Sequence, residues 1–238
     1  MMQYLLNEDD NMIKAVVFDL DDTLYKERDF VYSGFMEVAK YLGKKFSLNA
    51  DNIYKLILDI FHEKGRGKVF NILCDKYSLD ESVDKLVEIY RNNIPDIKLY
   101  DDAIYILERL KDTYSLGIIT DGKNTVQWNK IKALDVEKYI DKIIVTDDYG
   151  KEYWKPSKEP YKDLIKHFNV EPEECIYVGD NPNKDFISAK KLGMNTIRVI
   201  RKVGDYMDTF LSEEYEANYR ISSLTELEDI VHLINEKG

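Results

Sequence analysis

The feature that most constrains this chain is a short apolar run that ends in a dense group of carboxylates. Residues 15–18 are apolar and rich in β-branched and aromatic side chains, which is typical of a strand buried on both faces of a sheet. Asp19, Asp21 and Asp22 then follow within four residues. Open α/β sheets bind ligands at the carboxyl ends of their strands, so this pattern places negative charge where a ligand or a cation is expected.

The spacing of the first two carboxylates outlines a magnesium site. Asp19 and Asp21 flank a single residue, so an extended backbone would point both side chains the same way. Mg²⁺ prefers oxygen ligands and commonly takes one or two carboxylates together with phosphate oxygens and water. The alternative is a strand followed by an acidic helix N-cap, because Asp and Thr suit that position. This motif alone leaves both interpretations open.

Composition and charge exclude several classes of function. The 238 residues include 34 basic and 45 acidic side chains, and the net charge of -11 would repel nucleic acid and anionic membranes. Cys74 and Cys175 lie far apart in no metal-ligand spacing, which favours core thiols and a reducing, cytoplasmic location. No apolar run reaches the roughly 18 residues that span a bilayer, and residues 1–11 are too short and acidic for a signal peptide. We expect that segment to fray, unless Tyr4-Leu5-Leu6 docks.

An all-helical block follows the first strand. Helical apolar stripes are expected over 29–43, ended by Gly43, and from a cap at Asn49 or Asp51 to the loop at 65–67. Residues 68–77 and 82–92 indicate two more helices, and no strand is expected between residues 25 and 97. Such an insertion indicates a smaller helical cap domain at 28–96, beside a core made of 12–27 and 97–238.

The rest of the chain alternates between helices and strands. Helices are expected at 101–110, 124–134, 160–168, 186–192 and 224–234, and strands at 116–120, 143–146, 175–178, 196–200 and 219–222. This alternation predicts an α/β fold, a doubly wound, Rossmann-like parallel sheet with helices on both faces. Polar residues follow several strands, so side chains far apart in sequence are expected to meet at one edge of the sheet.

These strand ends together resemble the motifs of the haloacid dehalogenase-like superfamily of hydrolases, which form an aspartyl-phosphate. The residues that carry the resemblance, in chain order, are Asp19-Leu20-Asp21-Asp22-Thr23, Thr120, Lys155, and Gly179-Asp180 with Asp185. The resemblance covers residues 14–200, and the helical block falls where the superfamily inserts its cap. Thr120-Asp121-Gly122 and Gly179-Asp180-Asn181-Pro182 are similar to the phosphatase branch.

The resemblance implies a catalytic pair of aspartates. Asp19 would be the nucleophile, and one of its oxygens would bind Mg²⁺. Asp21 would protonate the leaving oxygen and later deprotonate water, a task that benefits from a pKa raised by neighbouring carboxylates. The backbone carbonyl of Asp21 would also bind the metal, and Asp180 would complete the magnesium shell. Asp185 is expected in the outer part of that shell, where it would fix a water or Lys155.

Positively charged and polar groups are expected to bind the substrate phosphate. Thr120 would donate its hydroxyl to a phosphoryl oxygen, and Lys155 would balance charge on Asp19 and on the phosphate. Asp121 and Gly122 are expected at the same phosphate-binding turn. Taken singly, Thr120 could be a strand-end cap and Lys155 a surface lysine, but their joint placement favours the catalytic interpretation.

The sequence therefore predicts a Mg²⁺-dependent phosphatase that acts on a small soluble phosphomonoester, such as a sugar phosphate or a nucleoside monophosphate. A phosphomutase remains open, because it would keep both aspartates. A dehalogenase would lack an acid at the position of Asp21, and a non-catalytic binding module would have lost a motif residue. Neither nucleic acid nor a membrane is expected as a partner, and the oligomeric state is left open.

One loop of the cap is a candidate for substrate selectivity. Arg66 and Lys68 lie beside glycines in the segment 62–68, and such a loop could bring a cation to a distal part of the substrate. The alternative is a solvated connection between helices.

Overall fold

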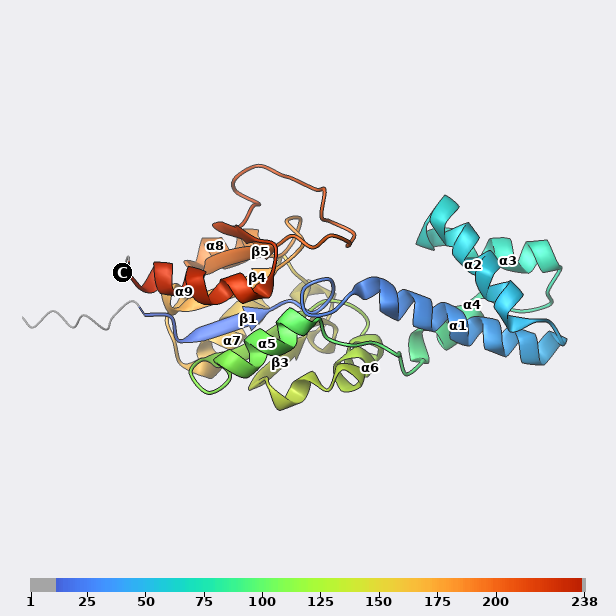
Figure 1. Cartoon of the computed structure of the whole chain (residues 1–238), viewed down its shortest axis with the longest axis horizontal. Coiled ribbons are helices and arrows are strands. Elements are labelled where there is room, and N and C mark those ends of the chain that lie inside the picture. Colours follow the sequence, from blue (N-terminus) through green and yellow to red (C-terminus); the bar gives the residue numbers. More distant parts are fainter. Residues whose placement is uncertain (1–11, 237–238) are drawn as a thin grey trace, which may run out of the picture.

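The computed structural model describes residues 12–236, which form an α/β core with a helical cap at one end (Figure 1). The core is built on a six-stranded sheet in the order β3-β2-β1-β4-β5-β6, and all neighbouring strands are parallel. Its strands are β1 (Ala15–Phe18), β2 (Ser115–Thr120), β3 (Lys142–Val145), β4 (Cys175–Gly179), β5 (Asn195–Val199) and β6 (Tyr219–Ile221). The predicted parallel sheet is confirmed.

The first strand lies at the centre of the sheet and contacts the core on both faces. Ala15 is paired with Ser115 of β2 on one side and with Cys175 of β4 on the other. Side chains alternate along a strand, so Val16 faces one hydrophobic cluster and Val17 faces the other. All four residues of β1 are buried, which explains why this stretch is apolar throughout.

Helices cover both faces of the sheet, as expected for a doubly wound fold. They are α5 (Asp101–Leu110), α6 (Asn124–Leu134), α7 (Glu159–Phe168), α8 (Phe186–Leu192) and α9 (Leu227–Asn235). Buried residues of α5, α6 and α9 join the cluster that contains Val16, whereas those of α7 and α8 join the cluster that contains Val17. The core is therefore a three-layer arrangement of helices, sheet and helices.

The cap consists of four helices inserted between β1 and α5. They are α1 (Glu27–Phe46), α2 (Ala50–Lys64), α3 (Val69–Tyr77) and α4 (Val83–Asn92). Figure 1 shows these helices at the end of the molecule opposite to α9. Residues 26–98 contain no strand, so the predicted helical insertion is confirmed.

The first cap helix is longer than its sequence pattern suggested. The helix was expected to end at Gly43, but α1 continues to Phe46 and ends at Ser47, whose φ is 55°. A Cβ atom on Gly43 would lie 3.0 Å from the carbonyl oxygen of Leu48. Glycine is therefore needed for the close return of the chain toward α2 and not for ending the helix. The start of α2 is capped by Asn49, whose side chain accepts a hydrogen bond from the Asn52 amide at 2.9 Å.

Two expectations concern the ends of the chain and membranes. The expectation for residues 1–11 falls outside the described residues. Within residues 12–236, none of the helices combines the length and the apolar character that crossing a bilayer requires.

Candidate active site

Three neighbouring strands bring the first, second and fourth motifs to one edge of the sheet. Phe18 of β1 is in register with Ile118 of β2 and with Val178 of β4. Because the strands are parallel, the residues that follow each of them emerge side by side. The Asp19 amide donates a hydrogen bond to the Val178 carbonyl at 2.8 Å, which extends the pairing into the site. The topology alone thus gathers Asp19, Thr120 and Asp180.

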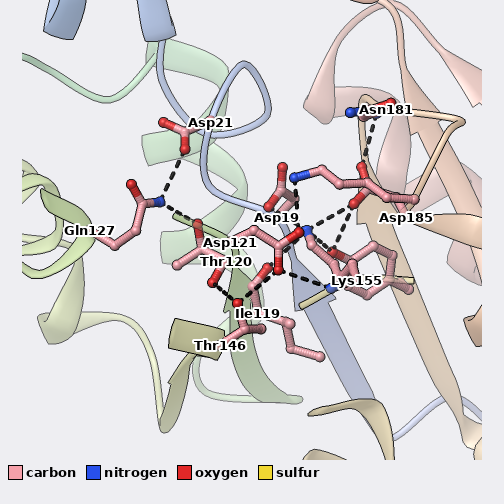
Figure 2. A network of polar contacts seen from close by, with 12 residues as sticks. Asp19, Asp21, Ile119, Thr120, Asp121, Gln127, Thr146, Lys155, Asn181 and Asp185 are labelled. Carbon is pink, nitrogen blue, oxygen red and sulfur yellow. Dashed lines mark hydrogen bonds and ion pairs between the residues drawn. The ribbon is translucent and has the colours of Figure 1, made fainter. Parts of the chain in front are cut away.

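Lys155 lies at the centre of this edge, and its side chain is fully buried. Its Nζ atom is 2.7 Å from Oδ1 of Asp19 and 2.8 Å from Oδ1 of Asp185. Figure 2 shows these three side chains pointing toward one another. The same Nζ atom also donates to the Ile119 carbonyl at 3.2 Å and to the Tyr177 hydroxyl at 2.9 Å. Burial by itself lowers the pKa of a lysine, but Asp185 and Asp19 outweigh that effect and raise the pKa of Lys155 well above its usual value. Lys155 is therefore a fixed positive charge.

Three carboxylates next to this lysine could hold a cation. One oxygen from each of Asp19, Asp180 and Asp185 lies within 4.8 Å of the others, and all three residues are buried. Burial raises the pKa of Asp19 to about 6, and burial together with Asp185, Asp19 and Asp22 raises the pKa of Asp180 well above its ordinary range. Lys155 contacts two of the three carboxylates and Lys184 lies nearby, so negative charge remains in excess. Buried hard oxygen donors with an excess of negative charge suit Mg²⁺.

The Asp21 carboxylate points away from this cluster. Figure 2 shows it directed toward Gln127, whose Nε2 donates to Asp21 Oδ2 at 3.0 Å. Lys130 Nζ lies 2.7 Å from Asp21 Oδ1, and the Tyr25 hydroxyl donates to the same oxygen. The carboxylate is therefore not one of the grouped metal-ligand candidates, and a contribution of Asp21 to the metal remains a prediction for its backbone carbonyl.

The expected rise in the pKa of Asp21 is wrong for this structure. Burial favours the neutral acid, but the charge and hydrogen bond of Lys130, with the hydrogen bonds of Tyr25 and Gln127, outweigh burial and lower the pKa. The neighbouring carboxylates that motivated the expectation contribute less than a lysine in direct contact. Asp21 is consequently an ionised carboxylate, which is the protonation state that a general base needs.

Gln127 and Lys130 of α6 are site residues that the sequence analysis missed. Both are buried, and Gln127 Nε2 also donates to the Thr120 hydroxyl at 2.6 Å. One helix side chain thus links the second motif to Asp21. A signal was present in the sequence, because residues 127 and 130 share the inward helix face with Ile131 and Leu134 at spacings of three, four and seven. Polar residues on such a face are buried only where they have partners.

Thr120 and Asp121, two of the predicted phosphate-binding residues, lie at the end of β2 and have different partners. Thr120 is fully buried and its hydroxyl faces Gln127. The Asp121 carboxylate instead accepts hydrogen bonds from the Thr146 hydroxyl at 2.8 Å and from the Lys155 amide at 3.1 Å. Its Oδ2 atom is 3.2 Å from Lys184 Nζ. This carboxylate is used to hold the loop that carries Lys155, so a contact of Asp121 with phosphate would have to come from its backbone.

Lysines keep the Asp121 carboxylate charged. Burial acts to raise its pKa, but Lys155 and Lys184 overcome burial and lower it. Gly122 follows with a φ of 139°, and a Cβ atom there would lie 3.0 Å from the Gln127 side chain. Glycine at this turn therefore leaves space for the residue that links Thr120 to Asp21.

Arg66 connects the cap to the core. Its guanidinium lies 2.9 Å from Oε1 and 3.3 Å from Oε2 of Glu27, and its Nη2 atom is 3.0 Å from Oδ2 of Asp205. Asp205 belongs to the irregular segment between β5 and β6, and its amide donates to Asp22 at 3.1 Å. The Glu27 amide donates to the other oxygen of Asp22 at 2.9 Å. The Arg66 side chain is 40% exposed, but it is held by carboxylates of two segments.

Two cavities meet above the site. One, of about 300 Å³, lies over the carboxylate cluster and includes Lys155 in its wall. The other, of about 410 Å³, lies between the cap and α6. Four residues line both cavities, namely Asp21, Glu27, Arg66 and Asp121. A ligand with a phosphate over the cluster could therefore extend into the larger cavity past Asp21.

Comparisons with known proteins agree with this geometry. The sequence profile of haloacid dehalogenase-like hydrolases matches residues 16–199. A glyceraldehyde 3-phosphate phosphatase of Methanocaldococcus jannaschii is 32% identical over 228 residues, which cover 92% of this chain and 97% of that protein. A protein of the same name from Pyrococcus furiosus is 30% identical over 236 residues, covering 94% of this chain and 95% of that protein.

Among solved structures, the HAD phosphatase from Thermococcus onnurineus is similar with a TM-score of 0.60 and 30% identity, covering 92% of this chain and 98% of that chain. The HAD hydrolase YfnB of Bacillus subtilis, solved with magnesium, has a TM-score of 0.65 at 20% identity and covers 92% of this chain and 99% of its own. At that identity the likeness concerns the fold.

Proposed function

Because this chain belongs to the haloacid dehalogenase-like hydrolases and is a phosphatase of that family, we propose that it hydrolyses a small soluble phosphomonoester in a Mg²⁺-dependent reaction through an aspartyl-phosphate on Asp19. The observation that carries the proposal is the buried Lys155, which contacts Asp19 and Asp185 beside Asp180. Relatives named glyceraldehyde 3-phosphate phosphatase and pyrophosphatase PpaX support a small phosphorylated substrate. A sugar phosphate and a nucleoside monophosphate are the two classes we consider.

The metal would be held by the grouped carboxylates. Asp19 and Asp180 would be direct ligands, and Asp185 would support the shell while it holds Lys155. The Asp21 backbone carbonyl is proposed as a further ligand from the family resemblance. Bound Mg²⁺ supplies Lewis-acid polarisation of the phosphoryl oxygens and offsets the excess negative charge.

The first chemical step uses two aspartates with different partners. An oxygen of Asp19 forms a bond to phosphorus while the bond from phosphorus to the leaving oxygen breaks, and Asp21 supplies the proton to that oxygen. Because Asp21 is held ionised by Lys130, it must take up a proton before this step, and loosening of the Lys130 contact favours that uptake. Lys155 and Thr120 stabilise the charge on the transferring phosphoryl group.

The second step returns the enzyme to its starting state. A water attacks phosphorus of the aspartyl-phosphate, and the bond between phosphorus and the Asp19 oxygen breaks. Asp21 accepts the proton of that water. The ionised state in which Asp21 is found here is the one that this step requires.

A panel of phosphorylated metabolites, assayed with Mg²⁺ for phosphate release, tests the proposal. We expect turnover of at least one phosphomonoester by the wild type and none by Asp19→Asn. Product analysis would separate hydrolysis from an internal phosphate transfer, which a phosphomutase would give. Release of phosphate by Asp19→Asn at a rate near that of the wild type would contradict the nucleophile, and release of halide from a haloacid would contradict the reaction class.

A further inference from the structure

We propose that the leaving alcohol of the substrate carries a planar aromatic ring, which the larger cavity between the cap and α6 would hold. This inference rests on the proposed phosphatase function and names the substrate class within it. It depends on the walls of the cavity, on where the cavity joins the phosphate site, and on its size.

Four aromatic side chains of the cap line this cavity and contact one another. They are Phe30, Phe35, Phe70 and Tyr90. Tyr90 is the central ring, with centroids 5.6 Å from Phe30, 5.6 Å from Phe35 and 6.0 Å from Phe70. Most of these pairs are edge-to-face, the arrangement in which aromatic rings attract one another. A planar ring entering the cavity would extend an existing aromatic cluster.

Four valines add to the apolar part of the wall. Val69, Val83 and Val87 lie on the cap side of the cavity, and Val126 of α6 lies on the core side. The polar lining is divided between exposed residues that can reach water and residues near the phosphate site. The exposed residues include Asn71, Arg91 and Lys123, and those near the phosphate site are Asp21, Glu27, Arg66, Asp121, Gln127 and Lys130. Hydroxyl groups placed against the rings and valines would have no partners on that part of the wall, which is costly.

The larger cavity joins the cavity over the carboxylate cluster next to Asp21. A ring held in the larger cavity would therefore belong to the leaving group of the substrate. Asp21 and Asp121 line both cavities, so a phosphate over Asp19 and Lys155 would direct its ester oxygen past Asp21 and into the aromatic cavity. Lys130, which contacts Asp21, also has its ammonium 4.5 Å from the centre of the Phe30 ring. Lys130 thus contacts both Asp21, the proposed proton donor, and the aromatic wall of the cavity.

The size of the cavity favours an aromatic alcohol over a triose. A volume of about 410 Å³ falls within the roughly 300–1,000 Å³ typical of pockets that enclose drug-sized ligands. The three carbons of a triose phosphate would leave much of it unfilled. Nucleoside 5′-monophosphates and simple arylmethyl phosphates share the required chemistry, a planar ring joined to the phosphate through a short linker.

A matched pair of synthetic substrates tests the ring directly. Benzyl phosphate and cyclohexylmethyl phosphate have similar bulk and a similar leaving alcohol, but only the first carries a planar aromatic ring. We expect benzyl phosphate to have a kcat/KM about threefold or more higher, because an aromatic pair adds about 0.5–1.5 kcal/mol beyond apolar burial. The kcat/KM of uridine 5′-monophosphate should exceed those of ribose 5-phosphate and glyceraldehyde 3-phosphate by about tenfold or more. Whether uridine 5′-monophosphate or benzyl phosphate has the higher kcat/KM then distinguishes a nucleotide substrate from a simple aryl phosphate. A triose or pentose phosphate as the best substrate, or equal values for the two synthetic esters, would overturn the inference.

A variant that fills the cavity gives an independent test. Val83→Trp places a large side chain in the cavity, whereas Glu88→Trp changes an exposed residue of the same helix that does not line it. We expect Val83→Trp to lower the ratio of kcat/KM for benzyl phosphate to that for ethyl phosphate by about tenfold, mainly through KM, and Glu88→Trp to keep the wild-type ratio. An unchanged ratio in Val83→Trp would overturn the inference.

Direct binding separates failure of this inference from failure of the phosphatase proposal. Calorimetric titration of uridine into the wild type and Val83→Trp should show binding that the substitution weakens about tenfold, even if no phosphate were released from any ester. Phosphate release without binding of uridine or of benzyl alcohol would instead leave the phosphatase proposal standing and reject the aromatic leaving group.

Discussion

At the scale of single residues, two lysines contact different carboxylates of the site, and these contacts affect the protonation of each carboxylate. Lys155 contacts Asp19 and Asp185, and Lys130 contacts Asp21. The first pairing leaves the pKa of Asp19 raised to about 6 by burial, whereas the second lowers the pKa of Asp21. Two aspartates separated by one residue therefore have different proton affinities, and the higher affinity belongs to Asp19. For the proposed first step Asp19 must be ionised and Asp21 must carry a proton, which is the reverse of the order that these contacts favour.

Asp19→Asn should abolish turnover and raise stability at alkaline pH in the absence of Mg²⁺. The folded pKa of Asp19 is raised from 3.8 to about 6, so the stabilisation from its proton is present below about pH 4 and is lost as pH rises through 6. We expect the Tm of Asp19→Asn in EDTA to exceed that of the wild type at pH 8, and the difference to disappear near pH 4. A difference that persists at pH 4 would show that the effect is not the ionisation of Asp19.

Asp21→Asn should slow poor leaving groups more than good ones. An alkyl oxide needs a proton as it departs, whereas p-nitrophenolate leaves readily without one. We expect the variant to lose about 10²-fold or more of kcat/KM on an alkyl phosphate and clearly less on p-nitrophenyl phosphate, measured by phosphate release at saturating Mg²⁺. Equal losses on both esters would mean that Asp21 is not the proton donor.

At the scale of elements, the cap is attached to the core through charged contacts near the site. The segment after α2 carries Arg66, which binds Glu27 at the start of α1 and Asp205 of the core. The same guanidinium lies in the wall of both cavities. This loop of the cap thus places Arg66 in the walls of both cavities, and its role in selectivity remains a prediction.

Arg66→Ala should lower kcat/KM for the best metabolite and spare p-nitrophenyl phosphate. The guanidinium can bind polar groups of the substrate beyond its phosphate, and p-nitrophenyl phosphate has few of these. Lys68→Ala is the matched control, since Lys68 is an exposed cation of the same loop that lines neither cavity. Steady-state kinetics on both substrates give the answer. Equal effects of Arg66→Ala on the two substrates would assign Arg66 to holding the cap and not to selectivity.

At the scale of the whole molecule, the candidate metal site joins segments that are distant in the sequence. The grouped carboxylates follow β1 and β4, and Lys155 comes from the segment between β3 and α7. These carboxylates come together only in the folded chain, so a cation would bind the folded state and not the unfolded state. Binding should therefore stabilise the fold as well as support the reaction.

Mg²⁺ should restore the activity that EDTA removes and should raise Tm. A ligand at about 100 times its Kd adds about 2.7 kcal/mol to the stability of the state that binds it. We expect a thermal shift with Mg²⁺ in the wild type that is reduced in Asp180→Asn, and inhibition by beryllofluoride with Mg²⁺, which mimics a phosphoryl group on Asp19. Full activity in EDTA would contradict the metal requirement, and an identical thermal shift in Asp180→Asn would place the ion elsewhere.

The sequence by itself determined the sheet, its helices and the place where the motifs meet. Periodicity is local, and parallel strands bring their carboxyl ends to one edge whatever the details of packing. The contact of Lys155 with Asp19 was expected from the resemblance of the motifs, and it is present in the structure. The helical cap followed from the same local patterns, although the role of Gly43 did not, because it depends on a contact with Leu48.

Only the tertiary structure decided what each site residue touches. Gln127 and Lys130 lie 106 and 109 positions from Asp21 in the chain, and their contacts arise because α6 packs beside the end of β1. A helix pattern shows that a residue faces inward, but not which group it meets. The protonation state of Asp21 depends on that meeting, because a cation in direct contact outweighs burial and more distant carboxylates. The same holds for Arg66, whose partners come from two segments that the sequence pattern does not relate.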